Sequence, residues 1–170
     1  MFAVVVTGPP GAGKTACLTA LTDALVDDQI AHAGIDVDEV AWAYPFPSVE
    51  QRAVLLGNAW DAHRRAGHDV LLLAEVVQSN AHLTQLLGSV GAGDHLLVRL
   101  EARPATMQER IVAREPPGWS GLEHLLGEVE RYAISLTELD GVHVTLDSEE
   151  LSPEEEAARI RAERPDKLAG

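Results

Sequence analysis

Cysteine, lysine and aromatic residues are scarce in this chain of 170 residues. The single cysteine, Cys17, excludes an intramolecular disulfide framework and a zinc site built from several cysteines. It falls within a helical pattern, where we expect a small core residue and not a nucleophile. Only 13 basic residues stand against 27 acidic ones, and a net charge of −14 repels phosphate backbones and anionic lipid. We therefore expect no nucleic-acid partner and no membrane-surface role.

Long hydrophobic runs are also missing. No uncharged apolar run approaches the roughly 18 residues that a membrane span needs. The first eight residues lack the basic segment of a signal peptide and lead directly into glycines and prolines. Hydrophobic residues make up 46% of the chain and charged residues 24%, which is typical of a globular protein with a buried core. We expect a cytoplasmic protein, monomeric or homodimeric, with one domain over residues 1–170.

Strand-like and helix-like patterns alternate about five times along the chain. Short apolar or β-branched runs predict strands at 2–7, 31–37, 69–74, 94–101 and 142–146. Apolar residues at helical spacing predict helices at 14–27, 48–67, 79–87, from Pro104 onward, at 122–136 and from Pro153 onward. This alternation predicts an α/β fold, with a five-stranded parallel sheet that carries helices on both faces.

Capping signals support several of these helix starts. Ser48 followed by Gln51, and Ser120 followed by Glu123, match the capping-box pattern, in which two side chains satisfy free amides of the first turn. Ser152 precedes a proline and three glutamates, whose charges complement the positive end of a helix. We therefore expect helices to begin at these three serines.

The motif that carries chemistry is the glycine-rich segment 8–15, Gly-Pro-Pro-Gly-Ala-Gly-Lys-Thr, which matches G-x-x-x-x-G-K-[ST]. It lies in its required context, directly after a buried strand and directly before a helix. Glycines allow the backbone to wrap closely around phosphate oxygens, and the following helix directs free amides at the same anion. We predict that ATP is bound by Gly8, Gly11, Ala12, Gly13, Lys14, Thr15 and Ala16.

Two residues of this motif have predicted roles in chemistry. Lys14, one of only two lysines in the chain, is placed to contact the outer phosphates, and the Thr15 hydroxyl to ligate Mg²⁺. The guanine-reading pattern Asn-Lys-x-Asp of GTPases is absent, although the preference for ATP over GTP stays open. A small-molecule kinase would need, in addition, a carboxylate at the acceptor hydroxyl, arginines for the transferring phosphoryl group and a pocket.

Candidates for the carboxylate and the arginines are present. Asp36 and Asp38 end the second predicted strand, at the edge where open α/β sheets bind ligands, although two acids at a strand end are as often simply solvated. Arg110 and Arg114 lie four residues apart and share a helix face, and Arg103 falls within about 40° of them if the helix reaches it. Pairing with the neighbouring acids 101, 109 or 115 is the alternative explanation for these arginines.

The glycine-rich loop, the Asp-x-Asp pair 22 residues after Lys14 and the arginine helix together resemble the small P-loop kinase superfamily. That group includes shikimate kinases, gluconate kinases, chloramphenicol phosphotransferases and nucleoside monophosphate kinases. The resemblance implies that Asp36 activates the acceptor hydroxyl and that Asp38 is the second acid of the shikimate and gluconate kinase pattern. It also implies that Arg110 contacts the nucleotide, that Arg114 contacts the transferred phosphoryl group, and that the loop after the fifth strand covers adenine.

The sequence gives weaker indications of the residues that would bind the phosphoryl acceptor. Trp42, Tyr44 and Phe46 alternate in one short segment, and they indicate either an apolar acceptor pocket or, with slightly better support, core packing. Arg52 is the only obvious arginine for an acceptor phosphate. Glu75 ends the third predicted strand, where a carboxylate could hold Mg²⁺ through water.

The sequence as a whole predicts an ATP- and Mg²⁺-dependent phosphotransferase that acts on a hydroxyl of a small molecule such as a nucleoside, sugar, metabolite or antibiotic. Lys14, Asp36 and Arg114 are the predicted catalytic residues, and a short lid is expected near 115–121, with Gly118 and Gly121 as hinges. Two alternatives stay open: a nucleoside monophosphate kinase, and a regulatory protein that binds ATP without catalysis.

Overall fold

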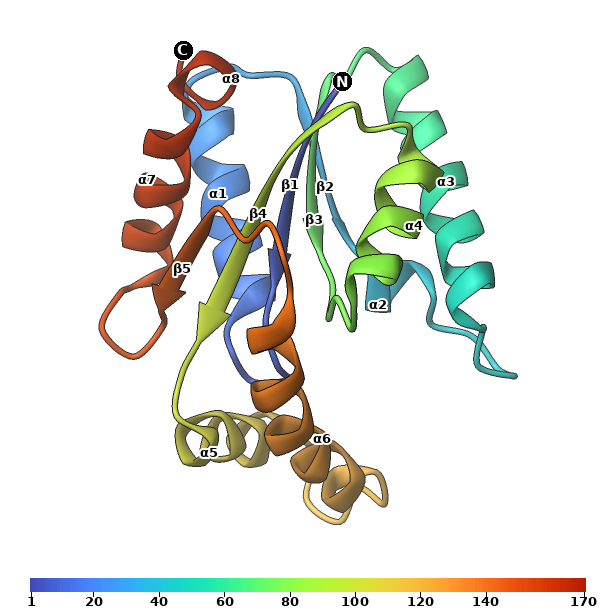
Figure 1. The fold of residues 1–170 in the computed structure, drawn as a ribbon, viewed down its shortest axis with the longest axis vertical. Helices are drawn as coiled ribbons and strands as arrows, with labels where there is room; N and C mark the ends of the chain where they lie inside the picture. The colour runs from blue at the N-terminus through green and yellow to red at the C-terminus, as the bar shows by residue number, and fades with distance from the viewer.

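The computed structural model describes residues 1–170 and shows a five-stranded parallel sheet in the order β2-β3-β1-β4-β5 (Figure 1). The strands are β1 (Phe2–Thr7), β2 (His32–Asp36), β3 (Val70–Ala74), β4 (Asp94–Glu101) and β5 (Val144–Asp147). The helices are α1 (Lys14–Asp27), α2 (Val37–Val40), α3 (Val49–Arg65), α4 (Asn80–Val90), α5 (Pro104–Arg114), α6 (Leu122–Ser135), α7 (Pro153–Glu163) and α8 (Pro165–Leu168), with a 3₁₀ turn at Leu136–Glu138. None of these helices is both long enough and apolar enough to cross a membrane. The predicted fold class is confirmed.

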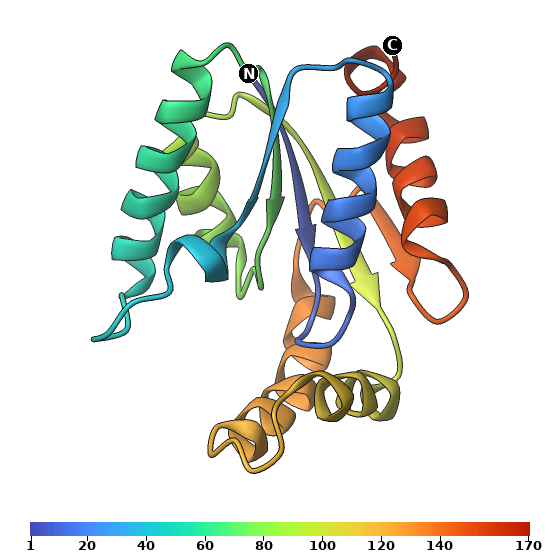
Figure 2. The same ribbon diagram turned by 180° about the vertical axis from the view of Figure 1, so that it is seen from behind.

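Helices cover both faces of the sheet, as Figures 1 and 2 show from opposite sides. Successive residues of β1 alternate between the two cores: Val4 and Val6 pack with residues of α1 and α7, whereas Ala3 and Val5 pack with residues of α3 and α4. Every residue of β1 is buried, because β1 lies at the centre of the sheet between β3 and β4. This central position, buried on both faces, explains why β1 consists of a nearly continuous run of apolar residues.

The carboxyl ends of the strands point to one end of the molecule, where α5 and α6 project beyond the sheet (Figure 1). Pro104 occupies the first turn of α5, as predicted, and its fixed backbone angle suits that position. Met107 and Ile111 of α5 are buried together with Val129 of α6 in the core on the α1 side. This packing fixes the arginine-bearing helix beside the glycine-rich loop.

Two helix boundaries differ from the sequence prediction. α4 does not end before Gly88 but continues to Val90, because its apolar stripe of Leu83 and Leu86 extends to that buried residue. α6 begins after Gly121, with no side-chain cap, so the capping box predicted at Ser120 is wrong. A turn in which the Leu122 amide donates to the Trp119 carbonyl places the helix start beyond the serine.

The other predicted helix starts are confirmed. Ser48 and Ser152 each form a complete capping box, with Gln51 and Glu155 respectively. The strands begin and end within two residues of their predicted bounds. Cys17 is fully buried in the core between α1 and the sheet, as expected.

Candidate active site

The glycine-rich loop 8–15 connects the end of β1 to the start of α1. Gly11 has a φ of 80°, and a Cβ atom there would lie 2.5 Å from the Met107 carbonyl oxygen of α5. Gly13 has a φ of 98° and caps α1 without a side chain, so the first-turn amides of this 14-residue helix have no side-chain acceptor. Both positions require glycine, because a side chain would be strained there or would clash with α5. The result is a cradle of backbone amides that suits phosphate oxygens.

Lys14 is folded back over this loop. Its Nζ atom donates hydrogen bonds to the carbonyl oxygens of Gly8 at 2.9 Å and Pro9 at 3.1 Å. Burial lowers the pKa of Lys14 to about 8, although the carboxylates of Asp38, Glu75 and Asp36 act in the opposite direction. A phosphate group in the cradle would favour the charged ammonium, so the residues present fit the binding of a nucleotide polyphosphate.

A cleft of about 350 Å³ opens beside the loop. Its walls come from the loop and α1, from the end of β2 with α2, and from α5 and α6. Most of the predicted site residues line it: Gly11, Gly13, Lys14, Thr15, Ala16, Asp36, Asp38, Arg110 and Arg114. Gly8 and Ala12 are buried within the loop itself. The structure thus brings together residues that lie up to a hundred positions apart in the sequence.

Asp36 lies in the wall of the cleft, directly beside the start of α1. Its Oδ2 atom accepts a hydrogen bond of 2.8 Å from the Thr15 hydroxyl. Its Oδ1 atom accepts from the Asp38 backbone amide at 3.1 Å, which makes Asp36 the N-cap of α2. The carboxylate is therefore held beside the predicted Mg²⁺ ligand, and the oxygen chemistry of Thr15 and Asp36 is of the kind that Mg²⁺ prefers.

Arg52 of α3 joins two carboxylates at the same edge. Its Nη2 atom lies 2.7 Å from Asp38 Oδ1 and 2.9 Å from Glu75 Oε2. Glu75 is buried, and its other oxygen accepts the Val76 amide at 2.8 Å. Burial raises the pKa of Glu75, against the opposing effect of Arg52. Both oxygens of Glu75 thus have a protein partner, and the suggested water-mediated contact with Mg²⁺ stays a prediction.

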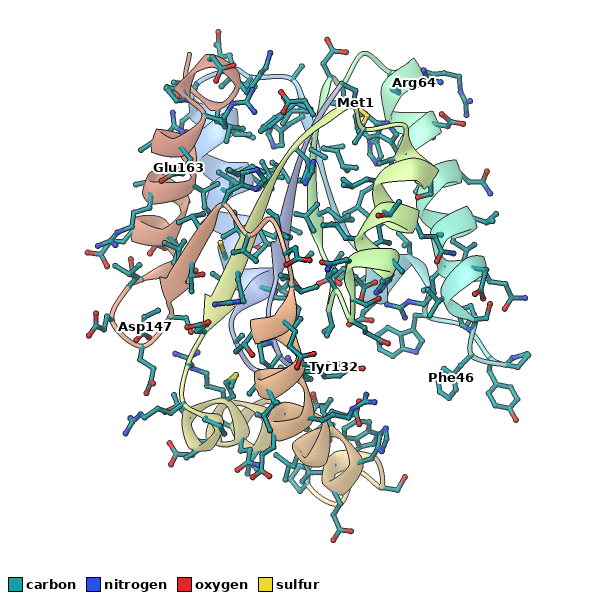
Figure 3. All side chains as sticks on the ribbon, viewed as in Figure 1. Met1, Phe46, Arg64, Tyr132, Asp147 and Glu163 are labelled. Atoms are coloured by element: carbon teal, nitrogen blue, oxygen red, sulfur yellow. The ribbon has the colours of Figure 1, made fainter.

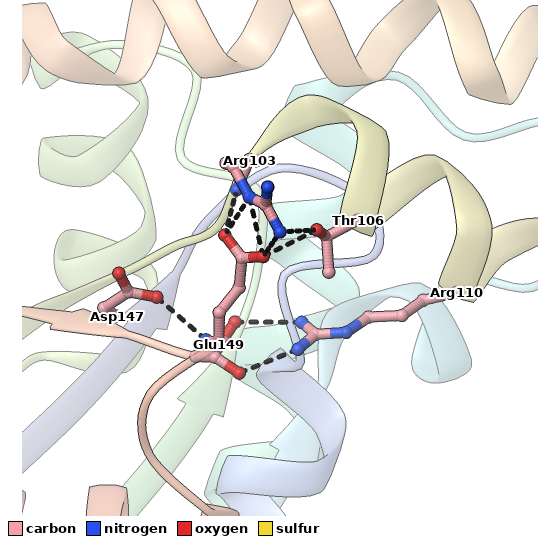
Figure 4. Close-up of polar contacts among 6 residues, drawn as sticks. Arg103, Thr106, Arg110, Asp147 and Glu149 are labelled. Atoms are coloured by element: carbon pink, nitrogen blue, oxygen red, sulfur yellow. Dashed lines mark hydrogen bonds and ion pairs between the residues drawn. The ribbon is translucent and has the colours of Figure 1, made fainter.

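The start of α5 is attached to the loop that follows β5 (Figure 4). Glu149 accepts hydrogen bonds from the Arg103 guanidinium at 2.8–3.1 Å, from the Arg103 amide at 2.9 Å and from the Thr106 hydroxyl at 2.6 Å. Chiefly because of Arg103, the pKa of Glu149 falls to about 2. Arg103 is the N-cap of α5 and does not continue the face of Arg110 and Arg114, because its backbone is extended. The prediction that Arg103 shares a helix face with Arg110 and Arg114 is therefore wrong.

Arg110 contacts the same loop, as Figure 4 shows, and also the glycine-rich loop. Its guanidinium donates to the Ser148 carbonyl at 2.7 Å, to the Ser148 hydroxyl at 2.9 Å and to the Gly11 carbonyl at 3.3 Å. Arg114 is more exposed and lies 2.7 Å from Glu115, one of the acids that the sequence suggested as partners. The two arginines thus lie in one cleft but in different surroundings.

The aromatic segment contradicts the prediction of core packing. Trp42, Tyr44 and Phe46 are 88%, 91% and 82% exposed, and none of them lines the cleft. The rings of Tyr44 and Phe46 meet edge to face, with centroids 6.1 Å apart. Figure 3 shows Phe46 at the outer edge of the molecule, on the segment that leads into α3. No strand or helix covers these rings, because the segment follows the four-residue α2 and leaves the body of the protein.

Comparisons with known proteins agree with this architecture. No protein-family model matches the chain, and no curated protein matches it. Among solved structures, it is similar to a sugar kinase from Janibacter sp. HTCC2649, with a TM-score of 0.67 and 18% identity over 100% of this chain and 99% of that chain. It is also similar to the Deinococcus radiodurans tunicamycin resistance protein, with a TM-score of 0.64 and 18% identity over 99% and 98% of the two chains. A gluconokinase from Sinorhizobium meliloti 1021 gives a TM-score of 0.61 and 19% identity over 98% and 94%. These likenesses show the fold, and the chain has the small P-loop kinase-like fold that its sequence resembles.

Proposed function

We propose that this protein is a kinase that moves the terminal phosphoryl group of Mg·ATP to a hydroxyl group of a small molecule. The observation that carries the proposal is the contact of 2.8 Å between the Thr15 hydroxyl and the Asp36 carboxylate. It joins the phosphate-binding loop to a carboxylate at the sheet edge where an acceptor would lie. The sugar kinase and the gluconokinase that share the fold support the same reaction class.

The phosphate side of the cleft would hold the nucleotide. Bound Mg·ATP supplies the phosphoryl group and the metal charge that stabilises its transfer. The amides at the start of α1 would bind phosphate oxygens, Lys14 would neutralise their charge, and Thr15 would offer a hydroxyl oxygen to Mg²⁺. Arg110, held between Ser148 and Gly11, would position the nucleotide base beside the loop after β5.

The acceptor side would carry the proton chemistry. Asp36 would accept the proton of the acceptor hydroxyl, and Arg114 would stabilise charge on the transferring phosphoryl group. Asp38 and Arg52 would orient the acceptor. Trp42 and Tyr44 would contact an apolar part of it only if their segment moves toward the cleft, because both are exposed outside it.

The segment 115–121 would serve as a lid over the cleft. Gly118 has a φ of 79°, which suits glycine, and no atom lies within 4 Å of the position that a Cβ would take. Gly121 immediately precedes α6. Movement between these two glycines would carry Trp119, which is 43% exposed.

A direct test measures ADP formation from Mg·ATP with and without a panel of sugars, nucleosides and hydroxyl-bearing antibiotics. Transfer that depends on the acceptor supports the kinase, whereas ATP binding without turnover across the panel supports a regulatory nucleotide binder. Transfer to nucleoside monophosphates alone supports the nucleotide kinase alternative.

The variant Lys14→Ala tests the phosphate site within the same experiment. We expect it to lose most ATP binding in calorimetry and to keep a normal circular dichroism spectrum, because Lys14 contacts the loop and the cleft and not the apolar core. Lys167→Ala, which changes the only other lysine, is the matched control and should bind ATP normally. Unchanged ATP affinity in a folded Lys14→Ala protein would contradict the phosphate site.

A further inference from the structure

We infer that the acceptor of this site carries no negative charge, so that uncharged polyols, nucleosides and amine-bearing sugars are accepted and sugar acids and nucleoside monophosphates are rejected. This inference rests on the kinase function proposed above. It concerns the acceptor edge of the cleft, formed by the end of β2 and by α2, with Arg52 of α3 in contact with Asp38 from outside the cleft lining.

Carboxylates dominate this edge. Asp36 and Asp38 line the cleft, and Glu75 lies behind Asp38, linked to it through Arg52. All three are close enough to Lys14 to act on its pKa. Arg52 supplies the only cation among them, and Asp38 alone balances its charge. Whether Glu75 is protonated or charged, the edge therefore carries net negative charge through Asp36.

Arg52 is already engaged by two carboxylates. The same Nη2 atom donates to Asp38 at 2.7 Å and to Glu75 at 2.9 Å. The Glu75 side chain is only 4% exposed while Arg52 covers it. An acceptor phosphate or carboxylate that drew Arg52 away would leave a buried carboxylate unpaired, which is strongly unfavourable. An anion that bound to the remaining N–H groups of Arg52 without moving it would still lie close to Asp38, which Arg52 contacts, and to Asp36 of the same edge.

The other cations of the cleft lie on its phosphate side. Lys14 contacts the glycine-rich loop, and Arg110 contacts that loop and Ser148. Arg114 lies at the end of α5 and pairs with Glu115. A nucleotide polyphosphate would bind to these three cations, because its phosphate oxygens carry more negative charge than any single acceptor group does. Only Arg52 then remains for an acceptor anion, and Asp38 already balances its charge.

Hydroxyl and ammonium groups suit the same edge. A carboxylate only accepts hydrogen bonds, whereas hydroxyl and ammonium groups donate them. An uncharged polyol could donate to Asp38 while it presents its reacting hydroxyl to Asp36. An amine-bearing sugar would add a favourable charge interaction at the same oxygen atoms. The charge pattern thus selects acceptors by exclusion of anions and not by a specific shape.

The experiment uses three matched acceptor pairs: glucose with glucosamine, sorbitol with gluconate, and thymidine with thymidine 5′-monophosphate. Within each pair the skeleton is the same while the charge changes. We expect kcat/KM for acceptor-dependent ADP formation to be at least about tenfold higher for the uncharged or amine-bearing members than for the anionic ones. Asp38→Asn should narrow the gap in kcat/KM between uncharged and anionic acceptors several-fold. The reason is that this change removes one negative charge and one partner of Arg52.

Glu39→Gln is the matched control, since Glu39 is an exposed acid on the same short helix and makes no side-chain contact with Arg52. It should leave the gap unchanged. Transfer that is equal or better with gluconate or thymidine 5′-monophosphate would overturn the inference and leave the kinase function standing. An unchanged gap in folded Asp38→Asn protein would also overturn it, because the discrimination would then come from elsewhere. ATP binding without ADP formation from any of these compounds or from any member of the wider panel would overturn the kinase function, and the inference with it.

Discussion

The Thr15 hydroxyl donates a hydrogen bond of 2.8 Å to Asp36 Oδ2, and this contact joins the start of α1 to the end of β2. A hydroxyl has one proton and two lone pairs, so Thr15 can hold Asp36 and still offer an oxygen lone pair to a metal ion. The second oxygen of Asp36 is fixed by the Asp38 amide. The predicted base is therefore oriented from both sides, which favours a defined proton acceptor over a solvated surface acid.

This arrangement predicts different outcomes for the two aspartates. Asp36→Asn should lower kcat by roughly 10²–10⁴ and leave ATP affinity nearly unchanged, because the amide retains the contact with Thr15 but cannot accept the proton. Asp38→Asn should mainly raise the KM for the acceptor, since Asp38 contacts Arg52 and not Thr15. Steady-state kinetics with any acceptor found in the panel measures both effects. A larger loss of kcat in Asp38→Asn than in Asp36→Asn would show that the two roles are exchanged.

The two arginines of α5 should also separate kinetically. Arg110→Ala should raise the KM for ATP with a smaller effect on kcat, because Arg110 joins the glycine-rich loop to Ser148 and so shapes the nucleotide side. Arg114→Ala should lower kcat far more than it weakens ATP binding, because its contact would strengthen as the phosphoryl group transfers. Unchanged kinetics in both variants, with a small loss of thermal stability, would show that the pair is structural.

Local sequence patterns predicted most of the fold because they report local physics. The alternation of β1 between two cores, the glycine-rich loop and the capping boxes at Ser48 and Ser152 each depend on residues that are neighbours in the chain. The loop also predicted the position of the cleft, since the carboxyl ends of parallel strands meet at one edge. The failed capping box at Ser120 shows the limit, because a turn at Trp119 decides where α6 begins.

Partners distant in the sequence were not predictable in the same way. Glu75 is 23 residues from Arg52, and Glu149 is 46 residues from Arg103. Which acid meets which arginine depends on sheet order and on how helices lie across the sheet edge, and neither is encoded in spacing. The exposure of Trp42 had no local signal either, since aromatic residues are usually buried. In the sequence, the one sign of the cluster around Arg52 was that this arginine is the only basic residue in a segment that contains several acids.

The loop after β5 offers a pH-dependent test. Glu149 has a pKa of about 2 in the folded protein, below the ordinary value of 4.5. Its contacts with Arg103 and Thr106 therefore contribute stability that is fully present above about pH 4.5 and is lost as the pH falls toward 2. Glu149→Gln should lower the melting temperature slightly at pH 7, and this deficit should shrink as the pH falls through that range. Glu150→Gln, which changes the exposed neighbouring acid, is the control and should not show a deficit that depends on pH in this way.

Glu156 of α7 predicts a pH dependence of the opposite sign. It is only 2% exposed, beside the buried Cys17 thiol of α1, and burial raises its pKa from 4.5 to about 7 although Cys17 and Arg110 act against this shift. The folded protein therefore holds a proton that the unfolded chain releases, so the free energy of unfolding should fall as the pH rises from about 4.5 to about 7 and then level off.

Glu156→Gln should remove this slope, because the amide keeps a polar partner for Cys17 without a charge. At pH 8 the variant should be more stable than the parent protein by up to about 3 kcal/mol, and at pH 4.5 the two should be nearly equal. Urea unfolding followed by circular dichroism between pH 4.5 and pH 8 measures the difference. Glu163→Gln, at an exposed position near the end of the same helix, should follow the parent protein throughout. A difference in stability between the parent protein and Glu156→Gln that does not change across this range would show that Glu156 is charged when folded, and that water or a cation reaches it between α1 and α7.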